Sequence, residues 1–211
     1  MDTADWVRRL LALGVTDIQL RVKDRPLAEI DAEVGAAAAA CREAGGRLWV
    51  NDYWALAVKH GAYGVHIGQE DLDALLLEQG EGGQGQQASS SPLAAVRDAG
   101  VRLGISTHTF EELGRAVALR PSYISLGPIY PTASKQVRFG PQGPPRIGQW
   151  RRLVDVPLVV IGGISLETAP ACLDAGADGI CIISALTKAA DLEGAVRAWH
   201  ALFEVRPQRP R

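Results

Sequence analysis

The segment 18–24, IQLRVKD, carries polar side chains at every second position. Gln19, Arg21 and Lys23 would all point to one side of a strand through this segment, with apolar side chains on the other. Two cations and an amide on one strand face are unusual in a plain core. An arginine can form a fork to a phosphate group and a lysine supplies a point charge. We therefore predict an anion site here, with a solvated strand face as the alternative.

Two acidic residues follow the next apolar segments. Asp52 ends LWVND and Asp71 follows GVHIGQE, so neighbouring parallel strands would place them side by side, with strands roughly 5 Å apart. A carboxylate without a partner at the end of a buried strand costs several kcal/mol. Mg²⁺ is a suitable partner, since it binds carboxylates together with substrate phosphate oxygens and water. Ion pairs with the nearby cations are the alternative.

The segment 127–136, GPIYPTASKQ, leaves a strand through Gly127 and Pro128 and then presents Thr132, Ser134 and Lys135. Two hydroxyl groups and an ammonium group beside an anion site could bind phosphate or diphosphate oxygens. A surface turn without a ligand is the alternative.

The segments VVIGGIS and ICIIS end in a further candidate anion site. Gly162 and Gly163 let the backbone approach a ligand closely, and Ser184 is expected to open a helix whose first N–H groups favour an anion. Phosphate sites after the last two strands are frequent in closed α/β barrels. A tight turn is the alternative.

One pattern positions all of these residues: a helix-like segment, a glycine, then a short apolar strand. Seven such strands alternate with helices, which predicts a parallel α/β fold. Polar residues follow nearly every strand, as in a (β/α)8 TIM barrel, where the carboxyl ends of all strands build the site. Because the chain opens with a helix over DWVRRLLAL, with Trp6, Leu10 and Leu13 on one face, we expect a TIM barrel lacking its first N-terminal strand.

Composition narrows the class of protein. The 22 basic and 24 acidic residues give a net charge of −2, so we expect no nucleic-acid or membrane partner. The three cysteines are far apart in apolar surroundings, which indicates reduced thiols in a cytoplasmic protein. We expect one domain over residues 1–205, a flexible Gly/Gln/Ser-rich insertion at 78–92, and a C-terminal tail at 206–211.

Six motifs, QLRVKD, VNDYWALAVKHGAYGVHIGQED, LGISTH, SLGPIYPTASK, VVIGGIS and CIISALT, resemble the thiamin phosphate synthase family in order across almost the whole chain. The resemblance implies a transferase of thiamine biosynthesis. Such an enzyme joins 4-amino-2-methyl-5-hydroxymethylpyrimidine diphosphate to 4-methyl-5-(2-phosphoethyl)thiazole, giving thiamin monophosphate and diphosphate. Both partners are then small molecules. The oligomeric state stays open, with a homo-oligomer among the expected forms.

The resemblance also implies roles for individual residues, in three groups. The pyrimidine diphosphate would be held by Gln19, Leu20, Arg21, Val22, Lys23, Asn51, Ser106 and Lys135. Among these the candidate catalytic residues are Arg21, Lys23, Lys135 and Ser106. The thiazole phosphate would be held by Thr132, Ala133, Ser134, Gly163, Ile183 and Ser184, and Mg²⁺ by Asp52 and Asp71.

The implied mechanism is dissociative. Cations stabilise the departing diphosphate, the aminopyrimidine carries the developing positive charge, and the thiazole nitrogen then attacks without a general base. Ser134 stands where this family usually has a second Thr, which keeps the hydroxyl group. The alternatives are an isomerase resembling the related thiazole tautomerase, and a non-catalytic remnant that binds thiazole phosphate or thiamin phosphate.

Overall fold

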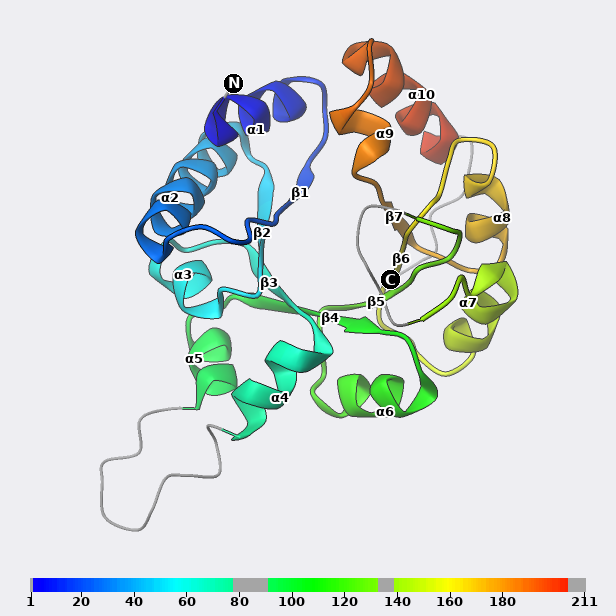
Figure 1. The fold of residues 1–211 in the computed structure, drawn as a ribbon, viewed down its shortest axis with the longest axis horizontal. Helices are drawn as coiled ribbons and strands as arrows, with labels where there is room; N and C mark the ends of the chain where they lie inside the picture. Colours follow the sequence, from blue (N-terminus) through cyan, green and yellow to red (C-terminus); the bar gives the residue numbers. More distant parts are fainter. Residues whose placement is uncertain (1, 78–90, 133–138, 205–211) are drawn as a thin grey trace. The chain divides into compact units, whose positions relative to one another are not determined.

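The computed structural model describes residues 2–77, 91–132 and 139–204 (Figure 1). The predicted insertion lies almost entirely outside these ranges, as do Ala133, Ser134 and Lys135. The chain divides into two compact units, Met1–Gly104 and Ile105–Arg211, which are described separately below. The strand order of the sheet is β1-β2-β3-β4-β5-β6-β7, so strands that are neighbours in the chain are neighbours in the sheet.

In the first unit the strands are parallel and the helices lie along one side of them (Figure 1). Its elements are α1 (Thr3–Ala12), β1 (Asp17–Leu20), α2 (Leu27–Ala44), β2 (Arg47–Asn51), α3 (Trp54–Lys59), β3 (Gly64–Ile67), α4 (Gln69–Leu77), α5 (Pro92–Asp98) and β4 (Arg102–Thr107), which crosses into the second unit. The core between strands and helices includes Ile30, Val34, Leu48, Val65 and Ile67, each at most 2% exposed.

The second unit repeats this organisation. Its elements are α6 (Phe110–Ala118), β5 (Tyr123–Leu126), α7 (Gly143–Arg151), β6 (Leu158–Ile161), α8 (Ala169–Asp174), β7 (Gly179–Cys181), α9 (Ser184–Thr187) and α10 (Leu192–Glu204). Strands β5, β6 and β7 are parallel. A buried hydrogen-bond chain joins its elements: the Trp150 indole donates to Thr107 Oγ1 at 2.9 Å, and that hydroxyl donates to the Ser125 carbonyl at 3.0 Å.

The predicted alternation of helices and parallel strands is confirmed, including a helix before the first strand. Within the described residues there are seven strands, as expected. The glycines predicted at helix ends, Gly14, Gly45, Gly61, Gly100 and Gly176, all have positive φ. Gly45, for example, ends α2 with φ 71°, a left-handed conformation that glycine adopts without steric cost.

Two local predictions are wrong. Strand β1 ends at Leu20, so Arg21, Val22 and Lys23 lie beyond it, because the chain must turn before Pro26 caps α2. Asp71 does not end a strand but lies in the first turn of α4, because β3 stops at Ile67 and the helix starts at Gln69.

The predicted N-terminal helix is present as α1. Its buried residues are Ala4, Val7 and Leu10, whereas Trp6 and Leu13 are half-buried. Trp6 and Leu13 therefore lie at the margin of the buried face of α1, which packs on α2.

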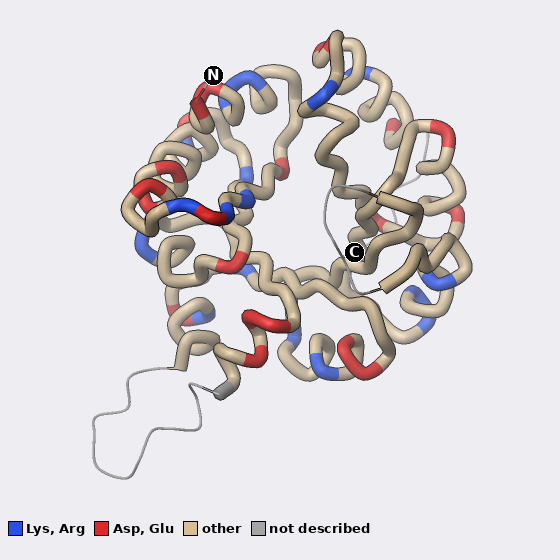
Figure 2. The backbone as a smooth tube through the Cα atoms, viewed as in Figure 1, with Lys and Arg blue, Asp and Glu red and all other residues tan. Residues whose placement is uncertain are grey.

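Charges are mixed along the chain. Figure 2 shows both signs of charge on several helices, such as α1 and α6, with no long segment of a single sign. No helix in the described ranges is long and apolar enough to cross a membrane.

Candidate functional site

In the first unit, four of the predicted site residues meet around one carboxylate. The Lys23 ammonium nitrogen lies 2.5 Å from Asp52 Oδ2, and the Asn51 side-chain amide donates to the same oxygen at 2.6 Å. The Asp52 side chain is 12% exposed and that of Lys23 is 41% exposed. Asp52 is therefore largely withdrawn from water, with a cation and an amide as partners.

The backbone explains how Asp52 reaches this position. Asp52 has φ 65°, a left-handed conformation that Asp and Asn adopt more readily than most residues. Its N–H donates to the His66 carbonyl at 2.8 Å, which extends the pairing of β2 and β3 by one residue. Its carbonyl accepts from Trp54 N–H at 2.8 Å, where α3 begins. The left-handed turn thus ends the strand and starts the helix.

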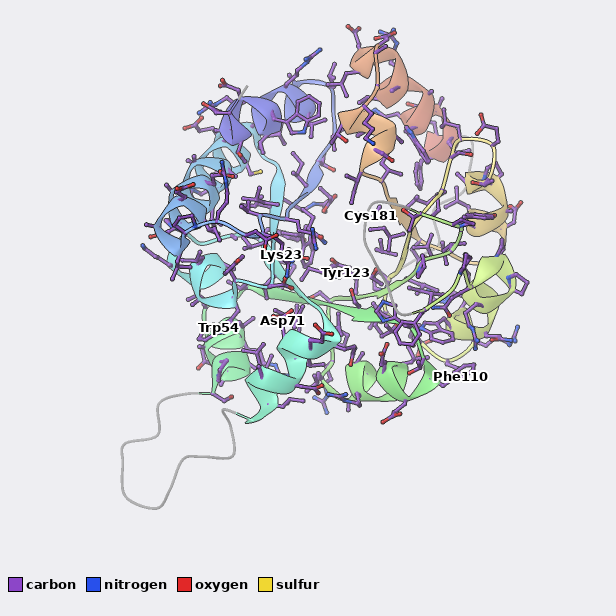
Figure 3. All side chains as sticks on the ribbon, in the orientation of Figure 1. Lys23, Trp54, Asp71, Phe110, Tyr123 and Cys181 are labelled. Carbon is purple, nitrogen blue, oxygen red and sulfur yellow. The ribbon has the colours of Figure 1, made fainter. Side chains whose placement is uncertain are left out.

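Asp71 brings a second carboxylate to Asp52. Burial, together with the charge of Asp52 and a hydrogen bond to it, raises the pKa of Asp71 above its usual range. Asp71 is half-buried in the first turn of α4, where a negative charge is favoured by the helix dipole. Figure 3 labels Asp71 together with Lys23, which comes from the segment after β1.

Lys23 is in turn influenced by several charges. Its pKa is raised chiefly by the hydrogen bond to Asp52, while burial and the charge of Arg21 oppose the shift. The predicted cations and the predicted acids are therefore neighbours. Lys23 and Asp52 form an ion pair, which was the alternative to a metal site. Asp52 and Asp71 also form the predicted pair of neighbouring carboxylates.

The donor set suits a hard divalent cation. Two carboxylates in contact repel one another, and Mg²⁺ binds through one or two carboxylates together with phosphate oxygens and water. Within the described ranges no group of three or more His, Cys, Asp or Glu side chains is arranged to hold a metal ion. A site made of protein ligands alone is thus not found there, whereas a site completed by a phosphate group is compatible with Asp52 and Asp71.

The remaining predicted residues of the first unit lie close to this cluster in sequence. Gln19 is half-buried in β1 and is in register with Trp49 of β2, two residues before Asn51. Leu20 ends β1, Val22 is half-buried and Arg21 is exposed after it.

The predicted residues of the second unit follow the ends of its strands. Ser106 is half-buried in β4, and Thr132 is half-buried after β5. Gly163 follows β6 with φ 65° and is exposed. Ile183 is 46% exposed and precedes Ser184, the first residue of α9. Because α9 spans only four residues, its dipole contributes less to anion binding than the sequence suggested.

Sequence reasoning did not pair two residues that meet at the start of α6, His108 and Glu112. His108 donates its backbone N–H to Glu112 Oε2 at 2.6 Å, and its Nδ1 lies 2.9 Å from the same oxygen. The His108 ring stacks on Phe139 with centroids 4.7 Å apart. Thr109 caps α6 and Glu112 is three residues later, so the capping pattern THTFEE could have identified this contact.

Comparison with known proteins gives concordant results. The sequence model of the family described as "Thiamine monophosphate synthase" matches residues 1–186. A thiamine-phosphate synthase of Cronobacter sakazakii is 46% identical over 198 residues, covering 93% of this chain and 87% of the relative. One from Escherichia coli O1:K1 is 47% identical over 192 residues, covering 90% and 83%.

Among solved structures, thiamine phosphate pyrophosphorylase from Pyrococcus furiosus is similar with a TM-score of 0.76 and 27% identity, covering 95% of this chain and 89% of that one. A 3-hexulose-6-phosphate synthase is similar in fold alone, with a TM-score of 0.64 at 18% identity, over 95% and 93% of the two chains. With the observed strand order, the first likeness confirms the predicted α/β fold of the TIM-barrel class.

Proposed function

Since this chain belongs to the thiamine monophosphate synthase family, we propose that it joins 4-amino-2-methyl-5-hydroxymethylpyrimidine diphosphate to 4-methyl-5-(2-phosphoethyl)thiazole. The products are thiamin monophosphate and diphosphate. The family assignment confirms the resemblance found in the six motifs and the expectation of a transferase. The substrates, the metal and the roles of individual residues are part of the proposal.

The observation that carries the proposal is the cluster of Lys23, Asn51, Asp52 and Asp71. It combines a cation, an amide and two touching carboxylates in one unit. A diphosphate bound as a metal complex needs both signs of charge, because the cation contacts phosphate oxygens while the acids hold the metal. An isomerase acting on a single phosphate ester needs neither the pair of acids nor the adjacent cations.

Each residue of the cluster has a task in this proposal. Lys23, Arg21 and Asn51 bind the pyrimidine diphosphate, and Asn51 also orients Asp52 through its 2.6 Å hydrogen bond. Asp52 and Asp71 would hold Mg²⁺, which when bound neutralises charge on the departing diphosphate. Lys135, outside the described residues, would add a third cation, and Ser106 a hydroxyl group.

The chemistry at the carbon is a substitution. The bond between the exocyclic carbon of the pyrimidine and the diphosphate oxygen breaks, and the electron pair leaves with the diphosphate. The thiazole nitrogen then supplies its lone pair to form the new C–N bond. Because no proton has to move, the proposal assigns no residue as a general base, and the cations act by stabilising the leaving group.

The second unit would hold the thiazole substrate. Its phosphate group would be bound by Thr132, Ala133, Ser134, Gly163, Ile183 and Ser184. The exposed Gly163 and the half-buried Thr132 support this assignment, since both follow strand ends, where a barrel of this class binds its ligands.

The experiment that tests the proposal measures diphosphate release with both substrates, with each substrate alone, and with EDTA in place of Mg²⁺. We expect release only when both substrates and Mg²⁺ are present, with thiamin monophosphate formed in equal amount. Conversion of the thiazole phosphate alone would support the tautomerase-like alternative. Binding of thiazole phosphate without turnover would support a non-catalytic remnant.

Three further statements belong to the proposal. We take residues 1–205 as one domain, with 78–92 as an insertion and 206–211 as a tail. We also take the chain to act in the cytoplasm on small molecules, without nucleic-acid or membrane partners. A homo-oligomer remains a prediction that size-exclusion chromatography with light scattering would test.

A further inference from the structure

The segment after β5 runs against the turn after β6. The Ile129 N–H donates to the Ile161 carbonyl at 3.0 Å, and the Tyr130 N–H donates to the Gly162 carbonyl at 2.9 Å. These two bonds continue the pairing of β5 with β6 beyond the end of β5 and one residue past the end of β6. Residues 127–132, called here the β5 loop, are thereby fixed to residues 161–163, called here the β6 turn.

The glycines allow the loop and the turn to lie backbone to backbone. A Cβ atom at Gly163 would lie 2.3 Å from the Pro131 carbonyl oxygen, and one at Gly162 would lie 2.7 Å from Pro128 Cα. From the other side, a Cβ atom at Gly127 would lie 2.7 Å from the Ile161 carbonyl oxygen. Since these neighbours are backbone atoms, they cannot move aside as a flexible side chain could. The β5 loop and the β6 turn therefore form one packed element.

The other side of the β5 loop is bonded to the start of α7. The Gln142 N–H donates to the Pro128 carbonyl and the Gly143 N–H to the Ile129 carbonyl, both at 2.9 Å. The Gln142 side-chain amide donates to the Gly127 carbonyl at 3.1 Å. Main-chain bonds thus hold the first half of the loop from two directions, and they end at Tyr130.

Tyr130 supplies a side-chain anchor where the main-chain bonds end. Its hydroxyl group donates to the thiol of Cys172, a residue of α8 that is 0% exposed. Burial, followed by the neighbouring thiol, raises the pKa of Tyr130, so the hydroxyl keeps its proton near neutral pH. A Cβ atom at Gly163 would lie 2.9 Å from Tyr130 Cβ. Tyr130 therefore contacts both the β6 turn and helix α8.

We propose that Tyr130, anchored by Cys172, is a positioning residue for the thiazole phosphate. The inference rests on the proposed function, in which Gly163 and Thr132 hold that phosphate. Tyr130 contacts Gly163 and is two residues before Thr132, so its anchor fixes the spacing between the two groups. Groups that are fixed before binding lose less conformational freedom when the ligand arrives. Tyr130 acts through these two residues and not on the reacting atoms.

The test compares steady-state constants of Tyr130→Phe, Cys172→Ala and Cys172→Ser. Loss of one buried hydrogen bond corresponds to about a fivefold change in an equilibrium constant. We expect Tyr130→Phe and Cys172→Ala each to raise the KM for the thiazole phosphate about fivefold, with kcat and the KM for the pyrimidine diphosphate unchanged. Cys172→Ser keeps an acceptor and should recover most of the affinity.

The matched control is Cys41→Ala, which removes a thiol that is 2% exposed in α2 of the first unit. It should lower the free energy of unfolding without changing either KM. The double variant of Tyr130→Phe with Cys172→Ala should raise the thiazole KM no more than one single variant does, because both remove the same bond.

Three results would overturn the inference: an unchanged thiazole KM in Tyr130→Phe, an equal rise in both KM values, or additive effects in the double variant. Calorimetric binding of thiazole phosphate to the unaltered chain separates this inference from the proposed function. If the chain binds that ligand but makes no product, the same variants are compared by Kd, so the inference is still decided.

Discussion

Replacing Asp52 by Asn should separate activity from stability more clearly than any other single change. The substitution removes one negative charge but keeps the shape of the side chain. It also keeps the backbone, since Asn tolerates φ 65° about as well as Asp does. Asp52→Ala would be less informative, because a left-handed alanine adds roughly 1–2 kcal/mol of strain to the electrostatic effect.

The expected effect on stability is small. The ion pair with Lys23 is 41% exposed on the lysine side, and pairs of this kind contribute about 1 kcal/mol or less. Removing the charge also removes the repulsion of Asp71, which offsets part of that loss. We therefore expect a change of under about 1 kcal/mol, or a few degrees in Tm. The expected effect on turnover is about 100-fold or more, the usual result of losing one preorganised electrostatic group.

The assay measures diphosphate release and thermal unfolding on the same preparation. The matched control is Asp24→Asn, which makes the same chemical change at an exposed acid that also has a positive φ, 59°. Asp24→Asn should retain turnover within about twofold. Near-normal turnover in Asp52→Asn would refute the role of Asp52, and an equal loss in both variants would show that charge near the β1 segment matters and not this carboxylate.

Three further predictions concern packing, thiol reactivity and the metal. Gly64→Ala should destabilise the chain by about 1–3 kcal/mol in urea unfolding, because its Cβ would lie 2.3 Å from the Trp49 ring; an unchanged midpoint would show that the ring can move. Desolvation raises the pKa of the half-buried Cys181 to about 11, so iodoacetamide at pH 8 should label it slowly in the folded chain and readily in urea; rapid labelling of the folded chain would show that the thiol is not desolvated. EDTA should stop product formation without changing the far-ultraviolet circular dichroism, and re-added Mg²⁺ should restore it; turnover in EDTA would exclude the metal role of Asp52 and Asp71.

The sequence predicted the elements well because their signals are local. Glycines after helices and short apolar runs occur within a few positions of what they specify. The residues around Asp52 were predicted in part, since the segments that follow consecutive parallel strands lie at the same edge of the sheet. Their order in the chain therefore indicated that they are neighbours, although neither Lys23 nor Asp71 ends a strand.

The details that were missed depend on contacts between distant residues. Asp52 adopts a left-handed φ, and Asp71 approaches it from a helix, which no local pattern specifies. The bond from Tyr130 to Cys172 joins a loop to a helix 42 positions later, so neither residue carries a signal of its own. The end of β1 at Leu20 follows from the turn into α2, and this overrode the alternation that continued to Lys23.

The most direct test of the central claim follows both products of one reaction. The chain is incubated with Mg²⁺, the pyrimidine diphosphate and thiazole phosphate deuterated in its phosphoethyl group. Mass spectrometry then measures labelled thiamin monophosphate and phosphorus NMR measures diphosphate. The account predicts one labelled thiamin monophosphate for each diphosphate released. Diphosphate release that does not depend on the thiazole, or a folded chain that yields neither product, would contradict it.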